Sequence, residues 1–332
     1  MTRARLFVLI FGPLPIVAAS VALSLCLKSD KTLPVAANDV LGLPALTSVA
    51  DGAERVSKSP RAAAARHTAK DPLSELCRQS AAQLKKRLAE GGQVIVRPPF
   101  VIAGDMTVEE LDSWHQRTIR PAADAMANSY FSVTPTQPIT VLLFPGETSY
   151  NENAKKLFED NGISVYGYYK PQSRTLVMNI GTGGGTLVHE LTHALIDFDF
   201  PDVPDWFNEG LASLHEQCRF RDGEDGAWVE GLENWRLAGL QKTIRAKRLR
   251  PLKTMIEAND FRGELEGVNY AQARYLCLYL QRQGALAKFY KQFRDGHAKD
   301  PFGVKSLENV LQITSWSQLD RDFQKWALAL EQ

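Results

Sequence analysis

The segment TLVHELTHAL, residues 186–195, places two histidines four positions apart, with a glutamate directly after the first. On an α-helix each residue turns by about 100°, so His193 lies about 40° and Glu190 about 100° from His189. The three side chains therefore share one face, with the leucines near the opposite one. Two imidazoles can hold a zinc ion while the carboxylate accepts a proton from water. The spacing predicts a zinc-hydrolase helix, although the HExxH pattern also occurs in unrelated helices.

A catalytic zinc site needs a third protein ligand, and Asp199 is one candidate because it follows His193 by six residues. Proteases that use this offset need a glycine between the two ligands to turn the chain sharply. Ile196 occupies that position here. The sequence therefore disfavours Asp199 as a metal ligand.

Glu209 is the second candidate, in the segment PDWFNEGLASLHE (residues 204–216). The proline and aspartate that open this segment are suited to begin a second helix. If this helix packs against the first, its glutamate completes a His–His–Glu set, and Gly210 would let the two helices approach closely. We therefore predict a zinc site whose ligands are His189, His193 and Glu209.

Together, HELTHAL and PDWFNEGLAS resemble the paired motifs of the gluzincin zinc metallopeptidases, and are most similar to the exported bacterial peptidase MA-like branch. In that branch a P-x-W-x-x-E-G-x-A segment follows the HExxH helix and supplies the third ligand. The resemblance covers about residues 138–283, with fifteen residues between His193 and Glu209. It implies a zincin-like catalytic domain that hydrolyses peptide bonds, with Glu190 as the general base.

The resemblance implies further site residues. Relatives stabilise the oxyanion with a tyrosine or histidine from a later helix, and VNYAQARYLCLYL (residues 268–280) resembles that helix, which makes Tyr270 the candidate. Ser213 stands where many gluzincins have an aspartate. The aminopeptidase motif GAMEN is absent, so the resemblance favours endopeptidase action on a peptide or protein substrate.

Other polar residues near the motifs receive smaller roles. Asp197 lies about 80° from His189 and is suited either to orient a ligand histidine or to face solvent. His215 points about 240° away from Glu209, which favours a packing role, whereas Glu216 shares the Glu209 face and either lines a cleft or meets solvent.

The glycine-rich GTGGG (residues 181–185) lacks the Gly-Lys-Ser/Thr ending of a phosphate-binding loop. It instead suggests a close approach of the backbone to a substrate or to the next helix. The strand expected just before it, residues 175–180, would pair with an extended peptide by main-chain hydrogen bonds.

Charge and composition fit an ordinary globular protein. Lys and Arg total 39 against 38 Asp and Glu, a formal charge of +1 over 332 residues, which gives no reason to expect a nucleic-acid partner. Cys77, Cys218 and Cys277 fall in the folded part, and two of them could pair in an oxidising compartment. The oligomeric state is left open.

The N-terminus indicates export. Two arginines precede an apolar run at residues 6–27, so residues 1–28 are either a signal peptide or an uncleaved membrane anchor. Cleavage would fit after Ala37, and Leu25 before Cys26 disfavours a lipid anchor. The expected location is periplasmic or otherwise extracytoplasmic, with the inner membrane as the site of any anchor.

Periodicity predicts an α+β fold, with a mixed β-containing N-terminal part and a mainly helical part after it. The expected order is a flexible linker at 29–70, an α/β segment at 71–135 and a zincin-like catalytic domain at 136–332. Along the whole folded part we expect helices at 71–92, 107–130 and 149–160, and strands at 93–105 and 138–145. A hairpin is expected at 165–180, and almost only helices beyond 205.

Two rival functions remain open. A zinc amidase acting on a cell-envelope substrate would have the same ligands. A non-catalytic relative that only binds zinc or captures a substrate is a different class of protein. Glu190 argues against the second rival, since holding the metal does not require it.

Overall fold

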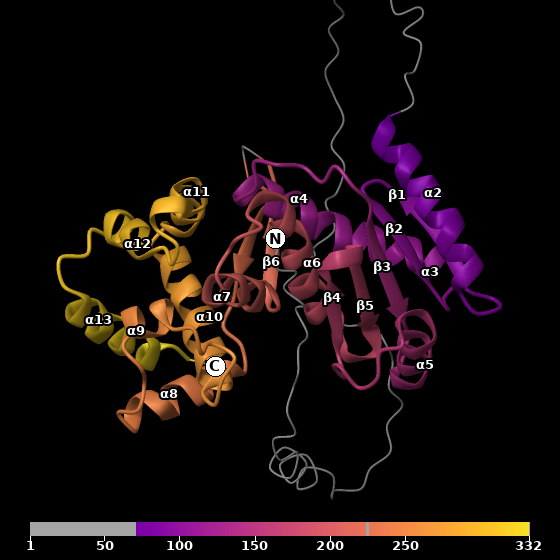
Figure 1. The fold of residues 1–332 in the computed structure, drawn as a ribbon. Helices are drawn as coiled ribbons and strands as arrows, with labels where there is room; N and C mark the ends of the chain where they lie inside the picture. The colour runs from indigo at the N-terminus through magenta and orange to yellow at the C-terminus, as the bar shows by residue number, and fades with distance from the viewer. Residues whose placement is uncertain (1–70, 224–225, 332) are drawn as a thin grey trace, which may run out of the picture. The chain divides into compact units, whose positions relative to one another are not determined.

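The computed structural model describes residues 71–223 and 226–331, and within them it confirms the α+β class. A five-stranded mixed sheet has the order β1-β2-β3-β5-β4 (Figure 1). Its three central strands run parallel to one another, and each edge strand is antiparallel to its neighbour. The strands are β1 (Gln93–Arg97), β2 (Phe100–Gly104), β3 (Ile139–Phe144), β4 (Gly167–Lys170) and β5 (Thr175–Asn179).

The strands follow from the apolar runs in the sequence. β3 (ITVLLF) and β5 (TLVMN) are nearly continuous apolar segments because helices cover both faces of the sheet. The strand expected at residues 93–105 is instead a hairpin, in which Arg97 pairs with Phe100 across Pro98 and Pro99. Proline cannot donate to a ladder, so the pair ends one strand and begins the next. The hairpin expected at 165–180 is confirmed as β4–β5.

Alternate strand residues point to two separate hydrophobic clusters. One face of the sheet packs against α2 (Pro72–Arg87) and α5 (Glu147–Phe158). The other packs against the helix expected at 107–130 and against the HExxH helix, α6 (Gly184–Asp199). The helix expected at 107–130 consists of three consecutive segments, which are α3 (Val108–Trp114), the π-helix η1 (His115–Ile119) and α4 (Arg120–Ser129).

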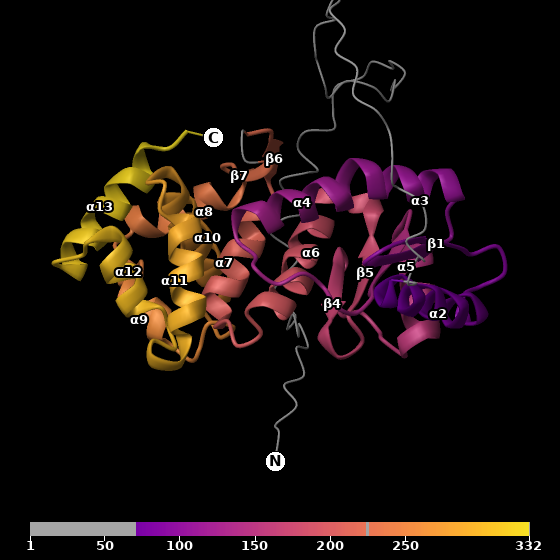
Figure 2. The ribbon, with the colours of Figure 1, turned by 90° about the horizontal axis from the view of Figure 1, so that it is seen from above.

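Beyond α6 the chain is mainly helical, and these helices gather on the side of α7 away from the sheet (Figure 2). The expectation of almost only helices is confirmed with one exception, since β6 (Cys218–Arg221) and β7 (Trp228–Gly231) form a separate hairpin. The helices are α7 (Asp205–His215), α8 (Arg236–Arg245), α9 (Leu252–Glu257), α10 (Glu266–Arg282), α11 (Leu286–Gly296), α12 (Val304–Leu311) and α13 (Trp316–Ala329).

The expected segments 71–135 and 136–332 share one sheet, since the former supplies β1 and β2 and the latter β3, β4 and β5. The predicted signal peptide or anchor (1–28) and linker (29–70) lie outside the described residues. Within the part that is described, no helix is both long and apolar enough to cross a membrane. Cys77, Cys218 and Cys277 are free thiols.

Candidate metal centre

The HExxH helix α6 begins directly in the glycine-rich segment. Gly183 has φ 105°, a left-handed conformation that suits glycine, and the helix starts at Gly184. A Cβ on Gly185 would lie 2.5 Å from the carbonyl oxygen of Glu216, just after α7. The segment therefore serves a close approach to the next helix, one of the two roles expected for it.

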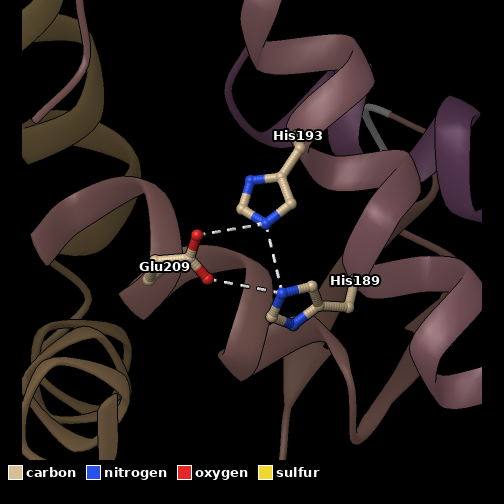
Figure 3. Close-up of side chains that lie close together, drawn as sticks. All are labelled: His189, His193 and Glu209. Carbon is tan, nitrogen blue, oxygen red and sulfur yellow. Dashed lines mark hydrogen bonds and ion pairs between the residues drawn. The ribbon is translucent and has the colours of Figure 1, made fainter. Parts of the chain in front are cut away.

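The three predicted ligands come together between α6 and α7. The Nε2 atoms of His189 and His193 are 3.1 Å apart. Glu209 places Oε2 at 3.5 Å from the first Nε2 and Oε1 at 3.6 Å from the second. Figure 3 shows both rings extending from one helix toward this carboxylate on the other. One ligand atom from each residue lies within 4.8 Å of the others, so this buried group can hold a metal ion.

The chemistry of these donors fits a cation at the centre. The Nδ1 of His193 is 2.8 Å from the amide oxygen of Asn208, which can only accept, so Nδ1 carries the proton. In the neutral ring this leaves the lone pair on Nε2, directed at the cluster. Two imidazole nitrogens 3.1 Å apart repel each other unless a proton or cation lies near both. Two imidazoles and a carboxylate form a donor set typical of a catalytic metal site.

Burial and mutual attraction shift the pKa values of the cluster. Burial lowers the pKa of His193, but the Glu209 carboxylate outweighs it and raises this pKa to about 9. Burial raises the pKa of Glu209, but the two histidines and Arg262 hold it well below its ordinary value. The carboxylate is therefore ionised at neutral pH and available as a ligand.

Glu190 lies beside this group without joining it. It is 4% exposed, and its carboxylate accepts a hydrogen bond from the backbone N–H of Tyr169 on β4. Burial raises the pKa of Glu190 above the usual range for a glutamate. A raised pKa suits a group that must take a proton and then release it near neutral pH.

A cavity of about 60 Å³ adjoins the cluster. Glu190, His193 and Glu209 are among the residues that line it, and four others are apolar. The apolar residues are Ile196, Phe200, Pro201 and Val203. The position of Glu190 on this cavity gives the carboxylate access to small molecules such as water.

Tyr270, the expected oxyanion residue, lies beside the cluster, where its hydroxyl interacts with the Glu209 carboxylate. Its hydroxyl accepts a hydrogen bond of 3.0 Å from Nη1 of Arg262, and it is not among the residues that line the cavity. Arg262 does line the cavity, and its Nη2 donates to Oε1 of Glu209 at 2.6 Å. No sequence pattern indicated Arg262, which lies in the connection between α9 and α10. Asn208 was also missed, although its position next to Glu209 could have indicated it.

Asp199 belongs to a network separate from the His–His–Glu group. Its carboxylate accepts the backbone N–H groups of Ser132 at 2.7 Å and Val133 at 2.8 Å. It also accepts the hydroxyl of Tyr290 at 3.0 Å and Nη1 of Arg294 at 2.8 Å. Asp199 therefore fixes the end of α6 to α11 and to the chain after α4.

Asp197 and His215 also have defined partners. Asp197 accepts a hydrogen bond of 3.2 Å from the hydroxyl of Tyr169 on β4. Its partner is therefore this tyrosine, in place of the ligand histidine or the solvent that the sequence suggested. His215 is fully buried, with Nδ1 at 3.1 Å from Oγ1 of Thr192, and burial lowers its pKa to about 3. The packing role expected for His215 is confirmed, although the ring contacts α6.

Ser213 and Glu216 follow Glu209 by four and seven residues, a spacing that places all three on the same face of a helix. The Oγ of Ser213 is buried without a hydrogen-bond partner among the described residues, so it gives the cluster no hydrogen-bond support. Glu216 forms an ion pair with Arg236, which excludes a simple solvent-facing role.

Two expectations about close contacts need correction. Gly210 faces α10, because a Cβ there would lie 3.0 Å from the carbonyl oxygen of Ala273, so it brings α7 close to α10 and not to α6. Strand β5, expected to pair with a peptide, lies between β3 and β4 and has no free edge. The sheet edge next to α6 belongs to β4.

Comparison of the chain with protein-family models and with curated proteins finds no match. The gluzincin resemblance therefore depends on the two motifs and on the site that their residues form.

Proposed function

We propose that this protein is a zinc-dependent hydrolase of the gluzincin type, acting as an endopeptidase. The main support is the buried group of two imidazoles and one carboxylate, with Glu190 beside it on the same helix. A sheet above the HExxH helix and a second helix that supplies the third ligand are the arrangement expected of a zincin-like fold. Two motifs separated along the chain thus meet in one site.

The residues divide the chemistry between them. His189, His193 and Glu209 would hold the zinc ion, which supplies polarisation of the substrate carbonyl and a lowered pKa for water. Glu190 takes a proton from the water whose oxygen attacks the carbonyl carbon. It then gives this proton to the leaving amine as the C–N bond breaks. Asn208 keeps His193 in the tautomer that binds metal.

The edge strand β4 supports a peptide as the substrate. The backbone carbonyl of Tyr166 points toward β5, where it accepts a hydrogen bond from the N–H of Asn179. Backbone groups alternate in direction along an edge strand, so those of Gly167 and Tyr169 point away from β5. The N–H of Tyr169 already points to Glu190. An extended peptide that pairs with this edge would pass directly in front of the general base.

We propose that the protein acts outside the cytoplasm, because residues 1–28 contain two arginines followed by an apolar run. The folded part would then act on peptides or proteins of that compartment. A membrane attachment through residues 6–27 would keep it at the inner membrane.

Metal analysis tests this proposal directly. Zinc would be measured by plasma mass spectrometry on the full-length protein and on two variants, Glu209→Gln and Glu216→Gln. Glu216 is the matched control, because it lies next to α7 and is paired with Arg236 outside the cluster. About one zinc per chain in the parent and in Glu216→Gln, with marked loss in Glu209→Gln, is the expected result.

Digestion of a peptide library by the zinc-loaded protein then tests the reaction. Internal cleavage products support endopeptidase action. Zinc binding without cleavage of any peptide would point to the amidase or to a non-catalytic zinc protein. A folded parent that binds no zinc would refute the proposal as a whole.

A further inference from the structure

Arg262 brings a permanent positive charge to the cavity beside the cluster. Among the described residues that line this cavity it is the single arginine, and no lysine is among them. Its side chain is 27% exposed, so the guanidinium is neither sealed in the core nor free in solvent. Any negative charge that forms in the cavity meets this group.

The guanidinium is fixed by three neighbours. Nη2 donates to Glu209 at 2.6 Å, Nη1 donates to Tyr270 at 3.0 Å, and Nε lies 3.8 Å from a carboxylate oxygen of Asp205. Each terminal nitrogen of a guanidinium carries two hydrogens. The two short bonds use one hydrogen on each, which leaves one donor on Nη1 and one on Nη2 for a ligand.

We propose that Arg262, and not Tyr270, donates to the carbonyl oxygen of the substrate as negative charge develops there. This inference rests on the proposed hydrolase function. Glu209 joins the two parts of the site, since the residue that would hold the metal also orients the guanidinium. The donor is therefore placed next to the metal ligands before a substrate arrives, as electrostatic stabilisation requires.

The reaction can be followed in electron pairs. When the water oxygen bonds to the carbonyl carbon, the π pair of the carbonyl moves to its oxygen, and the water proton goes to Glu190. When the C–N bond breaks, its pair leaves with nitrogen, the carbonyl re-forms, and nitrogen receives the proton from Glu190. Arg262 keeps its own protons throughout and only hydrogen-bonds to the charged oxygen.

Tyr270 has a positioning role in this scheme. Its hydroxyl accepts from Arg262 and also interacts with the Glu209 carboxylate, and its ring packs on Phe261 with 5.3 Å between centroids. Phe261 directly precedes Arg262, so the tyrosine supports both the backbone and the guanidinium of this connection. Removing its hydroxyl should affect the site less than removing the arginine side chain.

Binding of inorganic phosphate, a tetrahedral anion, tests this assignment without a known substrate. Titration calorimetry would give its dissociation constant on the zinc-loaded full-length parent and on Arg262→Met, Arg262→Lys and Tyr270→Phe. The expected result is at least tenfold weaker binding in Arg262→Met, a smaller loss in Arg262→Lys, and a change below threefold in Tyr270→Phe. Zinc content should stay at the parent level in each variant.

Three results would overturn the inference: no phosphate binding by the zinc-loaded parent, a larger loss in Tyr270→Phe than in Arg262→Met, or loss of zinc from both arginine variants. The last would mean that Arg262 acts only through Glu209. Phosphate binding that depends on Arg262, in a protein that cleaves no peptide, would instead count against the hydrolase function alone. If a peptide is cleaved, Arg262→Met should lower kcat by about 10²–10³-fold with little change in KM.

Discussion

His193 and Asn208 are joined by a 2.8 Å hydrogen bond between the imidazole Nδ1 and the amide oxygen. The bond crosses from α6 to α7, and Asn208 is the residue directly before Glu209. One turn of α7 therefore carries one candidate metal ligand and also fixes the tautomer of another on the neighbouring helix. Such a partner fixes the orientation of the ring and raises its basicity as a ligand.

Replacing Asn208 with alanine should weaken metal binding without removing a ligand. We expect the zinc dissociation constant to rise by about 10–100-fold, the usual effect of losing a hydrogen-bond partner of a ligand histidine. Competition with a chromogenic chelator would measure it. Asn151→Ala, at an exposed position on α5, is the control and should bind zinc as the parent does. Equal affinities in all three proteins would contradict a role for Asn208.

Glu190→Gln should separate metal binding from catalysis. Glutamine keeps the size of the side chain but cannot take the proton from water, so we expect full zinc content and a loss of hydrolysis of about 10²–10⁴-fold. Metal analysis and a peptide digest on the same preparation would check both. Zinc loss comparable to that of Glu209→Gln would show that Glu190 is a ligand and not the base.

The sequence predicted those parts of the fold that local patterns determine. The apolar run of β3 and the Lys170–Ser173 turn of the β4–β5 hairpin both appear in the structure as expected. The pair Pro98–Pro99 predicts an interruption of one strand, whereas two strands meet there. The β6–β7 hairpin was missed because each strand has only four residues, and the arginines of β6 are exposed, so neither strand forms an apolar run.

The grouping of His189 with His193 was predictable because helical spacing places side chains four residues apart on one face. Spacing alone does not reveal which neighbour a face will meet. Gly210 was correctly expected at a close helix contact, but the contact is with α10. Arg262 could not be predicted, since it reaches Glu209 from an irregular connection far along the chain. Such a contact depends on tertiary packing and leaves no periodic pattern.

Gly185 should not tolerate a methyl group, because the backbone after α7 lies very close to it. A Cβ would lie 2.5 Å from the backbone oxygen of Glu216, so α6 and α7 would have to separate. We expect Gly185→Ala to lower the free energy of unfolding by about 1–3 kcal/mol. Gly239 on α8 is the matched control, because a Cβ at that position would have nothing within 4 Å.

Gly239→Ala should stabilise the protein by about 0.5–1 kcal/mol, since alanine is the better helix former. Thermal and urea unfolding of the two variants would therefore shift in opposite directions. A Gly185→Ala variant as stable as the parent would mean that the contact at Glu216 relaxes easily. The destabilisation predicted from this close approach would then be wrong.

Asp199 should contribute stability that depends on pH. Burial raises the pKa of this carboxyl, but the hydrogen bonds from Arg294, Ser132, Val133 and Tyr290 outweigh it and hold the pKa below 3.8. The folded state therefore favours the charged form more than the unfolded state does. This contribution is fully present above pH 3.8 and is lost as the pH falls through the lower pKa of the folded protein.

Asp199→Asn should lower the free energy of unfolding at pH 7 by about 1–3 kcal/mol, because an amide cannot satisfy the same donors. The gap between variant and parent should narrow as the pH is lowered below about 4, where the parent loses the same charge. Unfolding by urea at several pH values would measure it, with the exposed Asp202→Asn as control. Zinc content should match the parent, because Asp199 belongs to the Arg294 network and not to the metal cluster. A variant that unfolds like the parent yet loses zinc would restore Asp199 as a ligand and displace Glu209 from that role.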